Sequence, residues 1–155
     1  MTPTATPLRP ITDLVPHRAS LLLLDELLAD TPEYVQAAFT PRADMLFLQD
    51  EGLPAWVGVE LMAQTVASWA GLRRLERGEK VQLGFLLGTR KYECTRPFFP
   101  VGKRLVMTAT HEMVSEQGLA VFICKIELDG EVIATASVNA FQPPNVEEYF
   151  KEYMS

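Results

Sequence analysis

One long apolar segment limits what this chain can fold into. Between residues 55 and 72 the only polar side chains are those of Glu60, Gln64, Thr65 and Ser68. A helix that is apolar around most of its circumference must be buried in a protein core or in a membrane. An acidic and an amide side chain interrupt the segment, and the sequence has no second segment of this kind. The pattern therefore favours a buried core helix over a membrane span.

Residues that typically start and stop a helix flank this segment. Pro54 fits the first helical turn, where its missing N–H costs nothing, and Gly78 follows the expected end near Leu75. A helix over residues 54–75 would span roughly 30 Å, which is the width of a small domain. The sequence therefore predicts one helix that crosses the whole domain.

Strand-like segments lie on both sides of the predicted helix. Before it, Ser20–Ala29 is a strongly apolar strand or short helix and Tyr34–Thr40 alternates between apolar and polar residues, with a turn at Asp30–Pro32 between them. After it, Asp129–Gly130 marks a two-residue hairpin turn. Four strands are predicted in that part of the chain: Gln82–Glu93, Arg104–Met113, Leu119–Leu128 and Glu131–Phe141.

This order of elements predicts an α+β domain of the hotdog fold, in which an antiparallel β-sheet wraps around one long central α-helix. A helix that is apolar nearly all round needs a sheet to surround it, since one flat contact would leave half of its apolar surface in water. The 155 residues suit one such domain. We expect a flexible N-terminal tail over residues 1–10, the hotdog domain over residues 11–142 and a C-terminal tail over residues 143–155.

Charge is distributed unevenly along the chain. Nine of the fourteen basic residues lie between Arg73 and Arg104, against three acidic ones, so this segment carries +6 and the remainder −12, for a net charge of −6. Such an acidic chain is a poor general binder of nucleic acid, but its basic segment suits an acidic protein or a phosphate group. The basic residues at the end of the predicted helix have a structural alternative, because the helix dipole favours cations there.

Targeting patterns and cysteines indicate the compartment. The first ten residues have neither the apolar run of a secretion signal nor the Arg-rich pattern of a transit peptide. Cys94 and Cys124 each lie in a predicted strand without metal-binding spacing, so buried reduced thiols are expected. These observations predict a cytoplasmic protein.

Glu60 is the most informative residue of the sequence. It lies in the second turn of the predicted buried helix, and Gln64 follows one turn later on the same side. A carboxylate in such a place loses hydration, which suits a general acid or base. The structural alternative is a buried carboxylate satisfied by Gln64 and a backbone amide near the helix N-terminus. Since an apolar residue would fill the site at lower cost, the position favours a functional role.

The two histidines give weaker indications. His17 directly precedes a run of leucines and is either a catalytic base or a residue that caps the nearby strand. His111, inside the predicted strand Arg104–Met113, is expected on an exposed face. Thr65 and Ser68 are assigned to helix packing. No metal site can be assembled from two separated histidines and two separated cysteines.

Several motifs together resemble a known family. Pro16–Arg18 followed by Leu21–Asp25 resembles the opening of the hotdog 3-hydroxyacyl-acyl-carrier-protein dehydratases, and Pro54 followed by Glu60–Gln64 is similar to their central-helix pattern. The stretch from Leu87–Cys94 through Pro100–Gly102 resembles a narrower group of dehydratases that are encoded with aryl polyene pigment synthesis. The resemblance covers about residues 11–142.

The resemblance implies dehydration of a 3-hydroxyacyl thioester on an acyl carrier protein to the trans-2-enoyl product. Glu60 would protonate the departing hydroxyl, and Gln64 would orient Glu60. Backbone amides at the start of the helix, around Val57 and Gly58, would hold the thioester oxygen as negative charge develops. No cofactor is expected, since the substrate is carried on the phosphopantetheine of the carrier protein.

One position departs from the family pattern. The catalytic histidine of the family lies eight residues before the helix proline, where this chain has Leu46. His17 is the provisional base, although the related dehydratases carry a histidine there as well as the catalytic one, which favours a structural role. Two alternatives remain open. A partner subunit could supply the histidine, since hotdog dimers build each site across the interface, or the chain could be a non-catalytic subunit that binds or orients the acyl chain.

The resemblance also implies partners. An acyl carrier protein is acidic, which suits the basic segment, and Arg90 and Lys91 are the first candidates for contact with it or with the phosphopantetheine. We expect a homodimer or a heterodimer with another hotdog subunit, and neither nucleic acid nor a membrane as partner. An acyl thioesterase, with Glu60 activating water, is the alternative enzyme.

Overall fold

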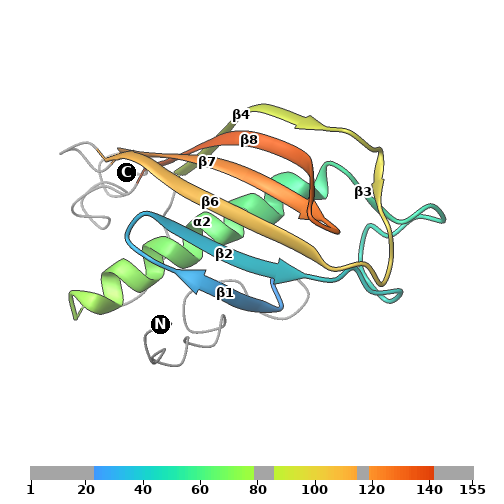
Figure 1. The fold of residues 1–155 in the computed structure, drawn as a ribbon, viewed down its shortest axis with the longest axis horizontal. Coiled ribbons are helices and arrows are strands. Elements are labelled where there is room, and N and C mark those ends of the chain that lie inside the picture. Colours follow the sequence, from blue (N-terminus) through green and yellow to red (C-terminus); the bar gives the residue numbers. More distant parts are fainter. Residues whose placement is uncertain (1–22, 79–85, 115–118, 142–155) are drawn as a thin grey trace, which may run out of the picture.

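The long apolar segment forms a single helix that lies against a curved antiparallel sheet (Figure 1). The computed structural model describes residues 23–78, 86–114 and 119–141. In these residues the elements follow one another along the chain as β1 (Glu26–Asp30), β2 (Tyr34–Phe39), β3 (Leu53–Pro54), α2 (Val57–Glu76), β4 (Leu86–Cys94), β5 (Phe98–Phe99), β6 (Leu105–Val114), β7 (Leu119–Leu128) and β8 (Glu131–Phe141).

Six strands form the main sheet in the order β1-β2-β6-β7-β8-β4, and all neighbouring pairs are antiparallel. In β2 and β7 alternate residues point toward α2, as Val35 and Ala37 of β2 and Phe122, Cys124 and Ile126 of β7 do, and all five are buried. These side chains and the apolar side chains of α2 form one core. The predicted arrangement, one long helix packed on an antiparallel sheet, is confirmed.

The helix begins later than the sequence predicts. Leu53 and Pro54 form β3 and pair with Phe98 and Phe99 of β5, so Pro54 belongs to a small two-stranded sheet and not to the first helical turn. This pairing holds Leu53 and Phe99 fully buried in the core, which favours it over an earlier helix start. The first helical residue is Val57. In the described part of the chain, no helix has the length and apolar character that crossing a bilayer requires.

The N-terminal hairpin is shorter than predicted. β1 begins at Glu26, whereas the prediction starts the strand at Ser20. Leu23 precedes the strand and directs its backbone N–H to the side chain of Gln64 in α2, at 2.9 Å. The side chain of Gln64 thereby replaces a strand partner at this point. Residues 20–22 lie outside the described residues.

The C-terminal strands follow the prediction closely. β7 and β8 have the predicted bounds, and their connection places Asp129 at a φ of 52° and Gly130 at 80°, as a mirror-image two-residue turn requires. β6 is displaced by one residue at each end. The start of the predicted strand Gln82–Glu93 and the turn predicted at residues 116–118 lie outside the described residues.

Both cysteines carry free thiols, as predicted, but the predicted burial holds only for Cys124. Cys124 is buried in the core, and burial raises the pKa of its thiol to about 12, so the thiol stays protonated at neutral pH. Cys94 is half-buried at the end of β4. The burial of Cys124 makes it a packing residue and not a nucleophile.

Candidate active site

Glu60 and Gln64 lie one turn apart on α2 and are joined by a hydrogen bond. The Nε2 of Gln64 donates to the Oε1 of Glu60 at 3.1 Å, and the Oε1 of Gln64 accepts the Leu23 N–H at 2.9 Å. Gln64 is fully buried. Because its amide is held at both ends, it can keep the Glu60 carboxylate in one orientation.

The Glu60 side chain is exposed in the single chain, contrary to the expectation that a buried helix covers it. Its place on the helix explains the difference. The next two residues, Leu61 and Met62, are fully buried in the core, whereas Glu60 lies on a side that the described residues leave accessible. Its carboxylate is therefore in reach of whatever binds at this surface.

Large apolar side chains are exposed close to the start of α2. Trp56 lies one turn before Glu60 and is 57% exposed, and Leu46 and Phe47 in the preceding loop are 58% and 60% exposed. The rings of Phe47 and Trp56 meet edge to face, with centroids 5.1 Å apart. We refer to Leu46, Phe47 and Trp56 as the apolar patch. Exposed apolar groups gathered near a carboxylate indicate a surface that binds a ligand or another protein.

The backbone amides at the start of α2 differ in what they bind. The Gly58 N–H donates to the Ala55 carbonyl at 3.0 Å. The Val57 N–H finds no acceptor in the part of the chain that the structure describes. Of the two amides expected to hold a thioester oxygen, Val57 therefore has an available donor, whereas Gly58 already uses its own.

Arg90 and Lys91 lie next to each other on the surface of β4. The pairing of β4 with β8 is irregular between Arg90 and Glu93, and Lys91 has a φ of 56° there. This β-bulge leaves Arg90 and Lys91 both exposed and turns Tyr92 inward, where it is half-buried. A regular strand would present only one of the two cations on this side.

The two histidines are the candidates for a catalytic base within this chain, since Leu46 stands at the place of the family histidine. His17 lies outside the described residues. The expectation that His111 lies on an exposed face is wrong, because its ring stacks on Trp69 at a centroid distance of 4.8 Å. Strand alternation explains this, since His111 shares the inward side of β6 with buried Ala109. Among the described residues, no three His, Cys, Asp or Glu side chains form a group that could hold a metal ion.

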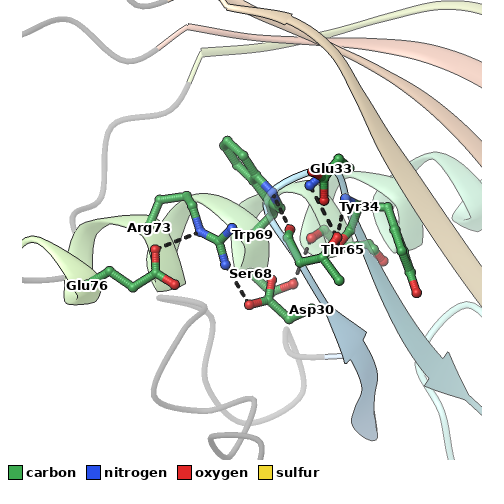
Figure 2. A network of polar contacts seen from close by, with 9 residues as sticks. Asp30, Glu33, Tyr34, Thr65, Ser68, Trp69, Arg73 and Glu76 are labelled. Carbon is green, nitrogen blue, oxygen red and sulfur yellow. Dashed lines mark hydrogen bonds and ion pairs between the residues drawn. The ribbon is translucent and has the colours of Figure 1, made fainter. Parts of the chain in front are cut away.

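A second polar cluster, which the sequence analysis missed, lies near the end of α2 (Figure 2). The Nη2 of Arg73 contacts the Oδ2 of Asp30 at 2.6 Å, and its Nε lies 3.2 Å from a carboxylate oxygen of Glu76. The guanidinium carbon lies 5.3 Å from the centroid of the Trp69 ring, and the Trp69 indole N–H donates to the Thr31 carbonyl at 3.2 Å. Burial raises the pKa of the Asp30 carboxyl to about 6, although Arg73 beside it acts in the opposite direction.

Two basic residues of the expected basic surface pair with acidic side chains of their own chain. The Arg73 side chain is only 15% exposed and pairs with acidic groups of its own chain. Arg104, at the other end of the basic segment, pairs with Glu26 at 2.7 Å. Arg73 therefore has a structural role through these ion pairs, and the exposed pair Arg90 and Lys91 is a better candidate for a partner contact.

Comparison with solved structures identifies the class of fold. The chain is similar to the structure described as the dehydratase heterocomplex ApeI:P from Xenorhabdus doucetiae, with a TM-score of 0.85 and 27% identity over 96% of this chain and 100% of that chain. The TT0310 protein of Thermus thermophilus has a TM-score of 0.58 and 18% identity over 76% of this chain and 90% of its own, a likeness of fold alone. With the architecture described above, these matches confirm the predicted hotdog fold.

Comparison of sequences then identifies the family. The family model described as ApeP-like, ApeP dehydratase, matches residues 9–151. The 3-hydroxyacyl-[acyl-carrier-protein] dehydratase FabZ of Streptococcus pneumoniae is 33% identical over 135 residues, which cover 83% of this chain and 91% of the relative. FabZ of Streptococcus uberis is 29% identical over 135 residues, covering 84% and 94%. The chain belongs to the ApeP-like dehydratase family, and the prediction of a dehydratase is confirmed.

Proposed function

We propose that this dehydratase removes water from a 3-hydroxyacyl thioester carried by an acyl carrier protein and forms the trans-2-enoyl thioester, in fatty acid or aryl polyene biosynthesis. Family membership and the similarity to FabZ support this reaction. The structural observation that carries the proposal is the exposed Glu60 carboxylate, which the buried Gln64 holds near the apolar patch.

The elimination needs one acid and one base. The base takes a proton from C2, the electron pair of that C–H bond forms the C2=C3 double bond, and the C3–O bond breaks. Glu60 gives its proton to the departing oxygen, so the hydroxyl leaves as water. The two proton transfers balance, because the base gains one proton and Glu60 loses one. No electrons enter or leave the substrate, and the elimination therefore requires no redox cofactor.

Negative charge develops on the thioester oxygen as C2 loses its proton. We assign the Val57 N–H to this oxygen, because no described residue accepts from it and because it lies at the positive end of the helix dipole. Gln64 keeps the Glu60 carboxylate oriented one turn further along the helix. The Val57 amide and the Glu60 carboxyl thus both belong to the first turn of α2.

The base in this proposal is a histidine of a second hotdog subunit. Leu46, at the place of the family histidine, belongs to the apolar patch. A subunit that covers this patch would exclude water from the site and could bring its own histidine. The similar structure from Xenorhabdus doucetiae is described as a heterocomplex, which supports a partner of this kind. His17 is the alternative base within this chain.

Product analysis tests the reaction and the source of the base. The purified chain is incubated with a 3-hydroxyacyl carrier protein, alone and together with the second hotdog subunit co-purified from the native cell, and the carrier is examined by mass spectrometry. We expect a loss of water from the acyl group only when both subunits are present, and full activity of the His17→Ala variant in that mixture. Release of free thiol would indicate a thioesterase, and activity of the chain alone that His17→Ala abolishes would assign the base to His17.

Contact with the acidic carrier protein is assigned to Arg90 and Lys91. In the double variant Arg90→Gln/Lys91→Asn both charges are removed, and Asn tolerates the left-handed backbone at position 91. We expect KM for the carrier-bound substrate to rise about threefold to tenfold, with a smaller effect at high salt. The matched control is Lys103→Asn, an exposed lysine before β6, three strands away from β4 in the sheet. An equal rise in KM in the control would contradict the assignment.

A further inference from the structure

The residues that lead into α2 are held by the segment that begins in β4 and ends in β5. Ala55 donates its N–H to the Pro97 carbonyl at 2.9 Å, and its own carbonyl accepts the Tyr92 hydroxyl at 2.5 Å. Just before it, Leu53 and Pro54 pair with β5. Residues 53–55 are therefore fixed on the same segment by backbone pairing and by the Tyr92 side chain.

Tyr92 reaches Ala55 because of the β-bulge in β4. In a regular strand, Arg90 and Tyr92 would lie on the same side of the sheet. The extra residue, Lys91, reverses the alternation, so that Arg90 stays exposed while Tyr92 turns inward. Lys91 accepts a φ of 56° to do so, a conformation that is uncommon for a residue with a Cβ. The bulge thus aims one particular side chain at the start of the helix.

Room for this side chain exists because residue 58 is a glycine. A Cβ at position 58 would overlap the Tyr92 hydroxyl and would lie 3.1 Å from the Cδ1 of Ile126. Glycine within a helix is less favourable than alanine, since it loses more backbone freedom on folding. Gly58 lies where the Tyr92 ring packs against the first turn of α2, and the missing Cβ leaves room for the ring there.

We propose that Tyr92 is a positioning residue of this dehydratase, whose hydroxyl fixes the Ala55 carbonyl and thereby sets the first turn of α2, which presents the Val57 N–H and the Glu60 carboxylate. The Ala55 carbonyl oxygen accepts two hydrogen bonds, one from the Tyr92 hydroxyl and one from the Gly58 N–H at 3.0 Å. Burial raises the pKa of the Tyr92 phenol above its usual range, which keeps it a donor. The catalytic consequence rests on the proposed function, whereas the effect on the helix start does not.

The structural part is tested by amide hydrogen exchange on the whole chain. Tyr92→Phe removes only the hydroxyl, and Tyr34→Phe, at the exposed start of β2, is the matched control. We expect amides of residues 58–60 to exchange about threefold to tenfold faster in Tyr92→Phe, with residues 65–72 and the control unchanged. Unchanged exchange at residues 58–60, or an equal increase along the whole helix, would overturn the proposal.

The catalytic part is tested by steady-state kinetics with the carrier-bound substrate. A displaced helix start misplaces the acid and the amide together, so we expect kcat of Tyr92→Phe to fall about tenfold while KM changes less than about twofold. Faster exchange at residues 58–60 with unchanged kcat would overturn the catalytic role. If the wild-type complex itself forms no enoyl product, the proposed function fails, and the exchange experiment still decides whether Tyr92 fixes the helix.

A double variant tests whether Tyr92 and Gly58 act through the same contact. Gly58→Ala places a methyl group on the Tyr92 hydroxyl, and removal of that hydroxyl relieves the closest overlap but leaves the 3.1 Å approaches to the ring carbon Cζ of residue 92 and to Ile126. We therefore expect Gly58→Ala to accelerate exchange at residues 58–60 less in the Tyr92→Phe background than in the wild type. If the change in exchange rate of the double variant equals the product of the changes in the two single variants, Tyr92 and Gly58 do not act through a shared contact.

Discussion

The two ends of α2 each carry a charged side chain, and the rest of the chain surrounds them differently. Glu60, in the first turn, is exposed and lies one turn after the exposed Trp56. Arg73, near the last turn, is 15% exposed and contacts Asp30 at 2.6 Å. The two residues lie about 20 Å apart along the helix. A charge that its own chain covers and pairs contributes to folding, whereas a charge left accessible beside apolar groups is available for chemistry with a substrate or partner.

This contrast also separates stability from activity. The buried pair Asp30 and Arg73 should affect the free energy of unfolding and leave the reaction almost unchanged, because it lies far from Glu60. Glu60 should behave in the opposite way, since an exposed side chain contributes little to stability. The following three changes test this division.

The largest effect is expected from Glu60→Gln, which removes the proposed acid but keeps the size of the side chain. We expect kcat/KM for the carrier-bound 3-hydroxyacyl substrate to fall about 10²-fold to 10⁴-fold, with Tm nearly unchanged. The matched control is Glu112→Gln, an exposed glutamate on β6. Full activity of Glu60→Gln would show that this carboxylate is not the acid.

Arg73→Ala should act mainly on stability. It leaves Asp30, whose side chain is 4% exposed, without its partner, and breaking a buried ion pair in this way costs about 3–5 kcal/mol. Urea unfolding measures the loss, and Arg42→Ala, which breaks exposed pairs with Asp25 and Asp44, should cost less than about 1 kcal/mol. If Arg73→Ala does not fold, urea unfolding is measured on the double variant Asp30→Asn/Arg73→Met, in which both charges of the pair are removed. Equal losses of unfolding free energy in the Arg73 and Arg42 variants would show that the buried and the exposed ion pairs contribute equally to stability.

Asp30 should give a smaller effect that depends on pH. Its pKa is about 6 in the folded chain against 3.8 as the reference, so the folded state binds more protons than the unfolded state between these values. The contribution of Asp30 to stability is therefore most favourable below pH 4, falls as the pH rises to about 6 and is constant above. We expect the free energy of unfolding of the wild type, relative to Asp30→Asn, to decrease over this interval. A difference that is independent of pH would contradict the raised pKa.

Local patterns determined most of the fold. The apolar run over residues 55–72 indicates α2, and the Asp129–Gly130 turn fixes the hairpin of β7 and β8 within the bounds predicted. The resemblance of several motifs to the dehydratases, among them Pro54 with Glu60–Gln64, implied the family, which the family model confirms. The helix and the hairpin depend on residues close together in the sequence, and periodicity or turn residues therefore reveal them.

Contacts between distant segments decided the rest. The pairing of β3 with β5 moved the helix start from Pro54 to Val57, and the bulge in β4 brought Tyr92 to Ala55, thirty-seven positions away in the chain. Arg73 looked like a surface cation at a helix end until the hairpin placed Asp30 against it. The sequence by itself determined the long helix, most strands of the main sheet and the family, and it made Glu60 the candidate acid. Only the tertiary structure decided which charges are covered and which stay accessible, because burial depends on the neighbours that the fold brings together.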